Sequence, residues 1–302
     1  MKTIILTACL LFCMVLSPLM AVAGRITDDS GDVLNFERPF ARIISLYPAH
    51  SDNIMALGAG ASLIGVSEED KELAAGGLPV FSHHDGAERF IAAKPDLVLL
   101  RPMIARANPA FVTALRRAGI AVASLQPNTF DQMFAYWRVL GQLTGQEWQA
   151  ESMIGAFQTR LTALRLKVAA IASENRPRVF FEAIHGKLKT FAPDSIAATA
   201  LKEAGGVNIA TEASQVRQTN IGVFGKERLL ALGESIDVYL AQQGRMNPVT
   251  IAQIENEPGF QAIKAVRQKR VYLVAEALTS RPTPSLLEGI ETIYALLHQE
   301  RP

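Results

Sequence analysis

Short apolar runs alternate along the chain with stretches of helical periodicity. An apolar run of about four to eight residues, bounded by proline, glycine or polar residues, is typical of a buried strand. A strand that is followed by a helix and then by another strand favours parallel pairing with crossover helices. The strands are expected over residues 42–47, 63–66, 96–100, 121–125, 178–184, 237–241 and 270–275.

Capping residues predict where several helices begin. We expect Ser51 to cap a helix over residues 52–57, because its hydroxyl can accept a hydrogen bond from a free backbone N–H. Asn108 precedes a proline and predicts a second helix start, since proline suits the first helical position. Thr283 also precedes a proline and is expected to open a last helix that runs to about residue 298.

The longest helical pattern lies in the middle of the chain, over residues 146–173, where no proline occurs. Its apolar positions recur at alternating steps of three and four residues, which is one face of a single helix. A helix of this length spans roughly 42 Å at about 1.5 Å per residue. A coiled-coil dimer seam is the alternative interpretation, but the flanking α/β halves favour a stiff connector. The apolar residues are Ile154, Phe157, Leu161, Leu164, Val168 and Ile171.

These patterns predict an α/β fold class with two lobes. Each of the two α/β lobes has a central parallel sheet, and one long rigid helix joins them. We assign residues 24–145 to an N-terminal α/β lobe, residues 146–173 to the inter-lobe backbone helix and residues 174–302 to a C-terminal α/β lobe.

The first 23 residues predict a cleaved signal peptide. Lys2 precedes an apolar segment that ends in the small-x-small pattern of residues 21–23, after which a signal peptidase cuts. A membrane anchor is the alternative, but a proline near the end of the segment favours cleavage. Cys9 and Cys13 both lie inside it, so the mature chain would contain no disulfide. We therefore expect secretion to the periplasm.

Charge and motif content exclude several classes of function. The chain has 30 basic and 29 acidic residues with no clustered basic run, which argues against a nucleic-acid partner. It contains no Gly-x-Ser-x-Gly elbow, no phosphate-binding loop and no His-Glu-x-x-His motif. We therefore expect a binding protein and no enzyme.

Several segments together resemble a known family. The most specific is AERFIAAKPDLVL at residues 87–99, and the others fit it in order and spacing: residues 42–58, 63–66, 204–209 and 265–272. The chain is similar to the periplasmic binding proteins in which one rigid helix joins two α/β lobes. Members of this class serve ABC importers of vitamin B12, ferric siderophores and haem.

The resemblance implies a periplasmic solute-binding protein of an ABC importer. Its ligand would be a metal chelate (a corrinoid, a ferric siderophore or haem) held in the cleft between the lobes. Its other partner would be an ABC permease in the inner membrane, and the protein would act as a monomer. No cofactor is expected, although the bound cargo would contain iron or cobalt.

Candidate ligand-binding residues follow from strand ends. Ligands bind beyond the carboxyl ends of parallel strands, and in this architecture both sets of ends face one cleft. Imidazole is a common metal ligand, and arginine can pair with an anionic chelate. The candidates are Tyr47, His50, Ser82, His83, His84, Arg101, Glu182, His185, Arg245 and Arg281.

Two alternatives use the same histidines differently. His50, His83, His84 and His185 would hold a bare transition metal in the first, and would surround the open metal position of a periplasmic metalloenzyme in the second. Two further residues match positions at which the family contacts its permease. These are Glu88 and Glu227, which would pair with permease arginines, or would be acids favoured at helix N-termini by the helix dipole.

Overall fold

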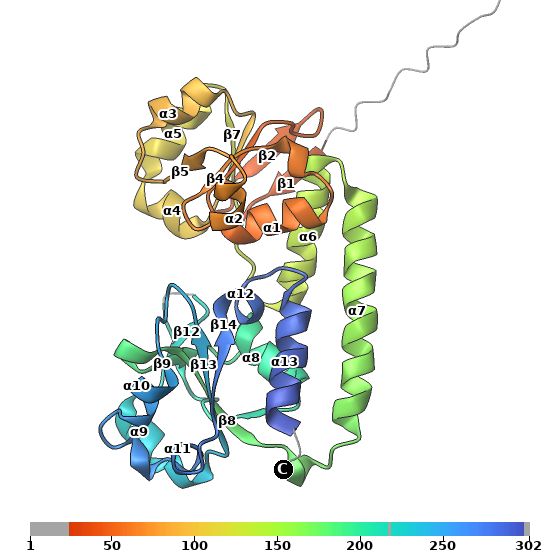
Figure 1. Cartoon of the computed structure of the whole chain (residues 1–302). Helices are drawn as coiled ribbons and strands as arrows, with labels where there is room; N and C mark the ends of the chain where they lie inside the picture. The colour runs from red at the N-terminus through yellow and green to blue at the C-terminus, as the bar shows by residue number, and fades with distance from the viewer. Residues whose placement is uncertain (1–23, 217–218, 299–302) are drawn as a thin grey trace, which may run out of the picture.

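The computed structural model describes residues 24–216 and 219–298, so the predicted signal peptide lies outside the described residues. Two α/β lobes are stacked one above the other, and the long helix α7 (Glu147–Ala169) runs along one side of both (Figure 1). The helix α13 (Leu286–His298) lies between α7 and the sheet of the second lobe (Figure 1). The predicted α/β fold with two lobes is confirmed.

The sheet of the first lobe is entirely parallel, with strand order β5-β4-β3-β6-β7. The strands are β3 (Ile43–Ser45), β4 (Leu63–Ser67), β5 (Val80–Phe81), β6 (Leu97–Leu100) and β7 (Ala121–Ser124). A separate antiparallel hairpin, β1 (Gly24–Thr27) and β2 (Val33–Phe36), precedes them. The helices are α1 (Pro48–Ala56), α2 (Lys71–Ala75), α3 (Ala87–Ala93), α4 (Pro102–Ala107), α5 (Pro109–Arg117) and α6 (Phe130–Thr144).

The sheet of the second lobe is mixed, which differs from the parallel sheet that the sequence predicts. Its order is β11-β12-β9-β8-β13-β14, and β10 also pairs with β8. The pairs of β8 with β13 and β13 with β14 are parallel, whereas β9 turns back antiparallel on β8. The strands are β8 (Arg178–Ile184), β9 (Lys189–Phe191), β10 (Val207–Asn208), β11 (Ser214–Gln215), β12 (Ile221–Val223), β13 (Val238–Gln243) and β14 (Val271–Ala275).

Short helices pack around this second sheet, and the last of them lies near the first lobe (Figure 1). They are α8 (Ile196–Glu203), α9 (Lys226–Ala231), α10 (Ile251–Glu255), α11 (Lys264–Arg267) and α12 (Glu276–Thr279). Residues 280–285 connect α12 to α13 at the junction of the lobes (Figure 1). The C-terminal lobe therefore reaches the N-terminal lobe at a second place besides α7.

The observed helix starts agree with the predictions in part. Asn108 caps α5, and its side chain accepts a hydrogen bond from the N–H of Phe111. The prediction for Ser51 was wrong: α1 already begins at Pro48, where proline suits the first helical position. The hydroxyl of Ser51 instead donates to the Ser45 hydroxyl at 2.8 Å. The last helix begins at Leu286, slightly later than expected.

The helix α7 buries one face in the protein's own core. The buried positions are Ala150, Ile154, Phe157, Leu161, Leu164 and Val168, and the helix ends at Ala169, short of the predicted end. One continuous apolar cluster includes all of these residues except Val168, together with Trp137 of α6 and Ile290 of α13. The alternative of a coiled-coil seam does not hold, because the chain itself covers the apolar face of α7.

Candidate functional site

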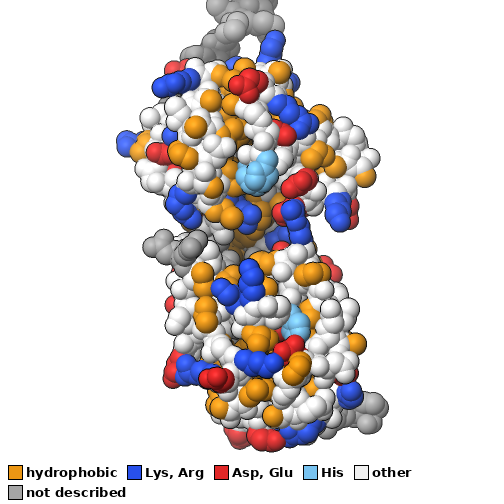
Figure 2. All heavy atoms as spheres, turned by 90° about the vertical axis from the view of Figure 1, so that its left-hand side faces the viewer, with side chains coloured by type: hydrophobic (Ala, Val, Ile, Leu, Met, Phe, Trp, Pro, Cys, Tyr) orange, Lys and Arg blue, Asp and Glu red, His pale blue; other side chains and the backbone are white. Residues whose placement is uncertain are grey.

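A cavity of about 430 Å³ lies between the two lobes. The N-terminal lobe contributes Tyr47, Glu69, Arg101, Met103 and Gln126. The C-terminal lobe contributes among others Phe191, Asn220, Ile221, Arg245, Glu276 and Arg281. The cavity is within the size range of small-molecule sites, roughly 300–1,000 Å³. Figure 2 shows the molecule narrowing where the lobes meet, with Lys and Arg side chains on both sides of this waist.

Residues that follow strands of the first lobe form the floor of the cavity. Tyr47 follows β3 and Arg101 follows β6, and these two strands are neighbours in the parallel sheet. The guanidinium of Arg101 lies over the Tyr47 ring, 4.6 Å from its centroid. Burial raises the pKa of the Tyr47 phenol, although Arg101 acts in the opposite direction. Tyr47 is therefore a neutral phenol that can donate a hydrogen bond to a ligand.

Arg101 differs from the other arginines of the cavity because no described acidic side chain forms an ion pair with it. Its Nε is buried and lacks a hydrogen-bond partner. An unpaired buried donor costs free energy, about 1–3 kcal/mol. A ligand oxygen that accepted this hydrogen bond would remove the cost. Arg101 is thus the group in the cavity best prepared for an anionic ligand atom.

Two arginines from the second lobe instead form ion pairs with acids of the first. Arg245 Nη1 lies 2.6 Å from Glu69 Oε1, and Arg245 Nη2 lies 3.5 Å from Glu68 Oε1. Arg281 Nη1 lies 3.6 Å from Asp52 Oδ2. The Arg245 pairs are largely exposed, and exposed pairs stabilise a fold only weakly. Such pairs can exchange a carboxylate for an anionic group of a ligand at low cost.

Ser82, His83 and His84 lie at the edge of the same cleft. They line a smaller cavity of about 100 Å³ that shares Tyr47, Arg101 and Arg245 with the larger one. The rings of the two histidines lie against each other with centroids 4.0 Å apart and their planes tilted by 40°. Partial burial and, secondarily, the electrostatic interaction with the neighbouring His84 lower the pKa of His83, which favours the neutral imidazole.

Replacing His83 and His84 together with alanine is expected to weaken ligand binding at least tenfold, about 1.4 kcal/mol. The reason is that both rings line the cleft beside Arg101 and Tyr47. Titration calorimetry measures the dissociation constant, and circular dichroism checks that the variant is folded. An unchanged dissociation constant in a folded variant would remove this loop from the site.

His50 does not line the cleft, which corrects its prediction as a ligand. His50 is part of α1, and its side chain is completely buried in the core of the first lobe. Its Nδ1 lies 2.6 Å from the Tyr136 hydroxyl, and its Nε2 lies 3.3 Å from the carbonyl oxygen of Leu100. Burial lowers the pKa of His50 to about 3, against a smaller raising effect of the Leu100 carbonyl. His50 is therefore a neutral core residue.

Glu182 and His185 also lie outside the two cleft cavities, contrary to their prediction. Glu182 is fully buried and accepts a hydrogen bond from the Tyr239 hydroxyl. Its carboxylate lies 2.8 Å from His185 Nδ1, and this hydrogen bond is the main cause that raises the pKa of His185. The pair belongs to a polar cluster of the C-terminal lobe that Asn247 completes.

The four histidines proposed as metal ligands do not come together. His50 is in the core of the first lobe, His185 is in the second lobe, and only the His83–His84 pair reaches the cleft. Across residues 24–216 and 219–298, no group of three or more His, Cys, Asp or Glu side chains could hold a metal ion. The geometry thus gives no support to a bare-metal site or a metalloenzyme centre on these histidines.

Glu88 and Glu227 each lie in the first turn of a short helix, α3 and α9 respectively. Both side chains are exposed, and neither forms an ion pair with another described residue. The two helices lie in different lobes, toward the far ends of the molecule and on the side away from α7 (Figure 1). Each lobe therefore carries one exposed carboxylate without a described ion-pair partner, on a helix at this side of the protein.

Some cleft residues were not predicted. Gln126 follows β7, so the strand-end rule applied to that strand would have found it. Phe191 and Asn220 reach the cleft from β9 and from the turn before β12. These are antiparallel strands, to which the rule for parallel strand ends does not apply. Trp137 is fully buried in the core and does not reach the cleft.

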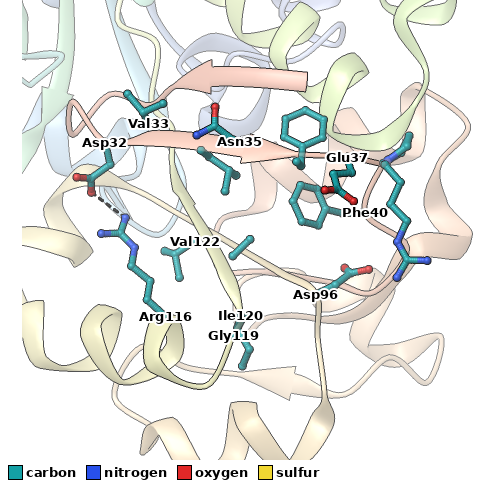
Figure 3. A pocket seen from close by; sticks show the side chains of 15 residues that line it. Asp32, Val33, Asn35, Glu37, Phe40, Asp96, Arg116, Gly119, Ile120 and Val122 are labelled. Atoms are coloured by element: carbon teal, nitrogen blue, oxygen red, sulfur yellow. Dashed lines mark hydrogen bonds and ion pairs between the residues drawn. The ribbon is translucent and has the colours of Figure 1, made fainter. Parts of the chain in front are cut away.

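A larger groove, about 780 Å³, lies within the first lobe alone (Figure 3). The β1–β2 hairpin forms one side and the segment around β7 forms the other, with an ion pair of 2.7 Å between Arg116 and Asp32 across it. Both walls belong to one lobe, so a relative movement of the lobes would not enclose a ligand there. The smaller inter-lobe cavity is the better candidate.

Comparison with known proteins agrees with this architecture. Residues 43–278 match the family model of the periplasmic binding proteins, so the chain belongs to this family. It is 26% identical over 277 residues to the uncharacterized ABC transporter substrate-binding lipoprotein YvrC of Bacillus subtilis, covering 89% of this chain and 83% of that protein. It is also 26% identical to the vitamin B12-binding protein of Vibrio parahaemolyticus, covering 83% of this chain and 87% of the relative.

Solved structures show the same fold. The chain superposes with a TM-score of 0.72 on the ABC-type Fe3+-hydroxamate transport system structure from Saccharomonospora viridis. That match is 22% identical and covers 91% of this chain and 98% of the other. Within the part of the chain that the structure describes, none of the helices has the length and apolar character needed to cross a membrane.

Proposed function

We propose that this protein is the periplasmic capture component of an ABC importer. It binds a metal chelate (a corrinoid, a ferric siderophore or haem) in the inter-lobe cleft and delivers it to a membrane permease. It acts by binding and release, without a catalytic step. Relatives named as ABC transporter substrate-binding and vitamin B12-binding proteins support the class of function. The bound cargo would bring iron or cobalt with it.

One observation carries the choice of site. Arg101 lies on the cavity floor with a buried, unpartnered Nε and with its guanidinium over the Tyr47 ring. A cation beside an aromatic face fits a large conjugated or chelated ligand with peripheral anionic or carbonyl oxygens. Phe191 and Ile221 supply apolar surface on the opposite wall. The combination suits an organic chelate better than a bare ion.

The direct test is titration of the purified protein with cyanocobalamin, ferrioxamine B and haemin. We expect one of them to bind with one equivalent per chain and to shift its visible absorption. Elemental analysis of the protein as purified provides the complementary measurement. A colourless protein that carries one equivalent of transition metal and binds none of the three chelates would contradict the proposal.

Replacing Arg101 with alanine is expected to weaken binding of that chelate by roughly 10- to 100-fold, because hydrogen bonds to charged groups contribute about 1.5–3 kcal/mol. The matched control is Arg106→Ala, since Arg106 is an exposed arginine of the adjacent helix α4 that does not line the cavity. Calorimetric titration compares both variants with the parent protein. Equal affinities for all three would remove Arg101 from the site.

A further inference from the structure

A backbone carbonyl of the second lobe is held by two side chains of the first. The carbonyl oxygen of Pro282, in the connection between α12 and α13, accepts a hydrogen bond from Trp137 Nε1 at 3.0 Å. It accepts a second from Asn53 Nδ2 at 2.9 Å. Asn53 and Trp137 are both fully buried. The two donors therefore occupy both lone pairs of one carbonyl oxygen, away from water.

The donors themselves are fixed by further contacts. The Asn53 amide also donates to the Ala49 carbonyl at 2.6 Å, and it lies 3.4 Å from the Tyr136 hydroxyl that contacts His50. The Trp137 ring packs edge-on against Phe157 of α7, with centroids 5.5 Å apart. Both donors are thus held by the first lobe and its backbone helix, and they have little freedom to follow the connection if it moves.

The residue before this carbonyl is Arg281, whose side chain lines the cleft. Because Arg281 precedes a proline, its own backbone is confined to extended conformations. Holding the Pro282 carbonyl in place therefore also limits where the Arg281 backbone can lie. The guanidinium of Arg281 extends back to the first lobe, 3.6 Å from Asp52, which is the neighbour of Asn53 on α1. A residue of the second lobe is in this way held against the first.

We propose that Asn53 and Trp137 are positioning residues for ligand binding. By holding the Pro282 carbonyl they form a buried link between the lobes, in addition to α7 and the exposed Arg245 ion pairs, and they fix the Arg281 guanidinium in the cleft. The inference rests on the proposed function, because it takes the inter-lobe cavity as the ligand site. It assigns a role in affinity to two residues that do not touch the cavity.

A double-mutant cycle tests whether Trp137 acts through Arg281. Trp137→Phe removes the N–H donor but keeps an aromatic ring in the core, and Arg281→Ala removes the guanidinium. The dissociation constant is measured for whichever of cyanocobalamin, ferrioxamine B and haemin binds. We expect Trp137→Phe to weaken binding roughly fivefold in the parent protein, as for the loss of one hydrogen bond, but less than twofold when Arg281 is already alanine.

Two outcomes of the cycle would overturn the inference. One is equal affinity of the parent and Trp137→Phe, and the other is the same loss from Trp137→Phe in both backgrounds. The matched control is Trp148→Phe, because Trp148 is 77% exposed on α7 and the chain has only these two tryptophans. Failure of the proposed function is distinguishable, since no chelate would then bind the parent protein.

A second measurement needs no ligand. Hydrogen exchange of the amides of residues 280–286 reports directly on whether the connection is held, since Thr283 and Leu286 donate within it. We expect Trp137→Phe, and separately Asn53→Ala, to speed exchange of this segment several-fold while α7 stays as protected as in the parent. Unchanged exchange of the segment in both variants would overturn the inference, whatever the result with chelates. Using two variants guards against one that fails to fold.

Discussion

A variant carrying both Glu88→Lys and Glu227→Lys is expected to bind ligand like the parent protein and to deliver almost none of it to the permease. Both carboxylates are exposed, and neither is paired with another described side chain. The helices that carry them, α3 and α9, lie on the same side of the molecule, one in each lobe (Figure 1). Two such groups can report to a partner whether the lobes are correctly juxtaposed.

The size of this effect follows from charge complementarity. Reversing a charge at a contact with a permease arginine replaces attraction by repulsion, which lowers the association rate and disturbs register. We expect transport into vesicles that contain the permease to fall at least tenfold for the double reversal. Ligand affinity of the free protein should stay within about twofold, because neither residue lines the cleft cavities.

The matched control for this variant is Glu147→Lys with Glu288→Lys. These acids also lie in first helical turns, of α7 and α13, and both are exposed. The control therefore repeats the loss of a favourable helix-dipole interaction, about 0.3–1 kcal/mol per residue, on other helices. Normal transport by the Glu88/Glu227 variant, or an equal loss in the control, would mean that the two glutamates are only helix-terminal acids.

The second large effect concerns the stability of the fold in acid. We expect His50 to be a principal cause of the decrease in the free energy of unfolding as the pH falls. Burial lowers the pKa of His50 in the folded protein to about 3, whereas an unfolded histidine has a pKa of 6.5. The unfolded state therefore binds a proton first as the pH falls below about 6.5. The free energy of unfolding then decreases by up to about 1.4 kcal/mol per pH unit from this one group, until the pH reaches the folded pKa.

The measurement is urea unfolding of the parent and of His50→Gln at pH 7.5 and pH 4.5. Between these values the parent should lose roughly 2–3 kcal/mol more than the variant, because glutamine does not titrate. The cost of the substitution itself at neutral pH cancels in this comparison. A parent and variant that lose the same stability over the interval would contradict the assignment of His50.

His185→Gln is the control with the opposite sign. The hydrogen bond to Glu182 raises the pKa of His185, so its contribution to stability is fully present below the unfolded pKa. That contribution is lost as the pH rises through the folded pKa. Removing His185 should therefore make the protein more sensitive to acid relative to the parent, whereas removing His50 makes it less sensitive.

Much of the first half of the site could be predicted from the sequence. Tyr47 and Arg101 follow apolar runs that are β3 and β6, and parallel strands bring such positions to one edge of a sheet. The error at His50 has a local cause. The helix α1 begins at Pro48, so His50 is already helical, and it points inward to Tyr136, which is 86 residues away in the sequence.

By itself, the sequence determined the α/β class, the two lobes, the long helix between them and the strand ends that carry Tyr47, Arg101 and Arg245. These follow from local periodicity and from the rules of parallel strands, which need only neighbouring residues. The tertiary structure alone decided which histidines are buried, how β9 turns back on β8, and that Pro282 is held by Asn53 and Trp137. Asn53 and Pro282 are 229 residues apart. No local pattern encodes such a contact, because only the packing of the two lobes brings the donors and the carbonyl oxygen together.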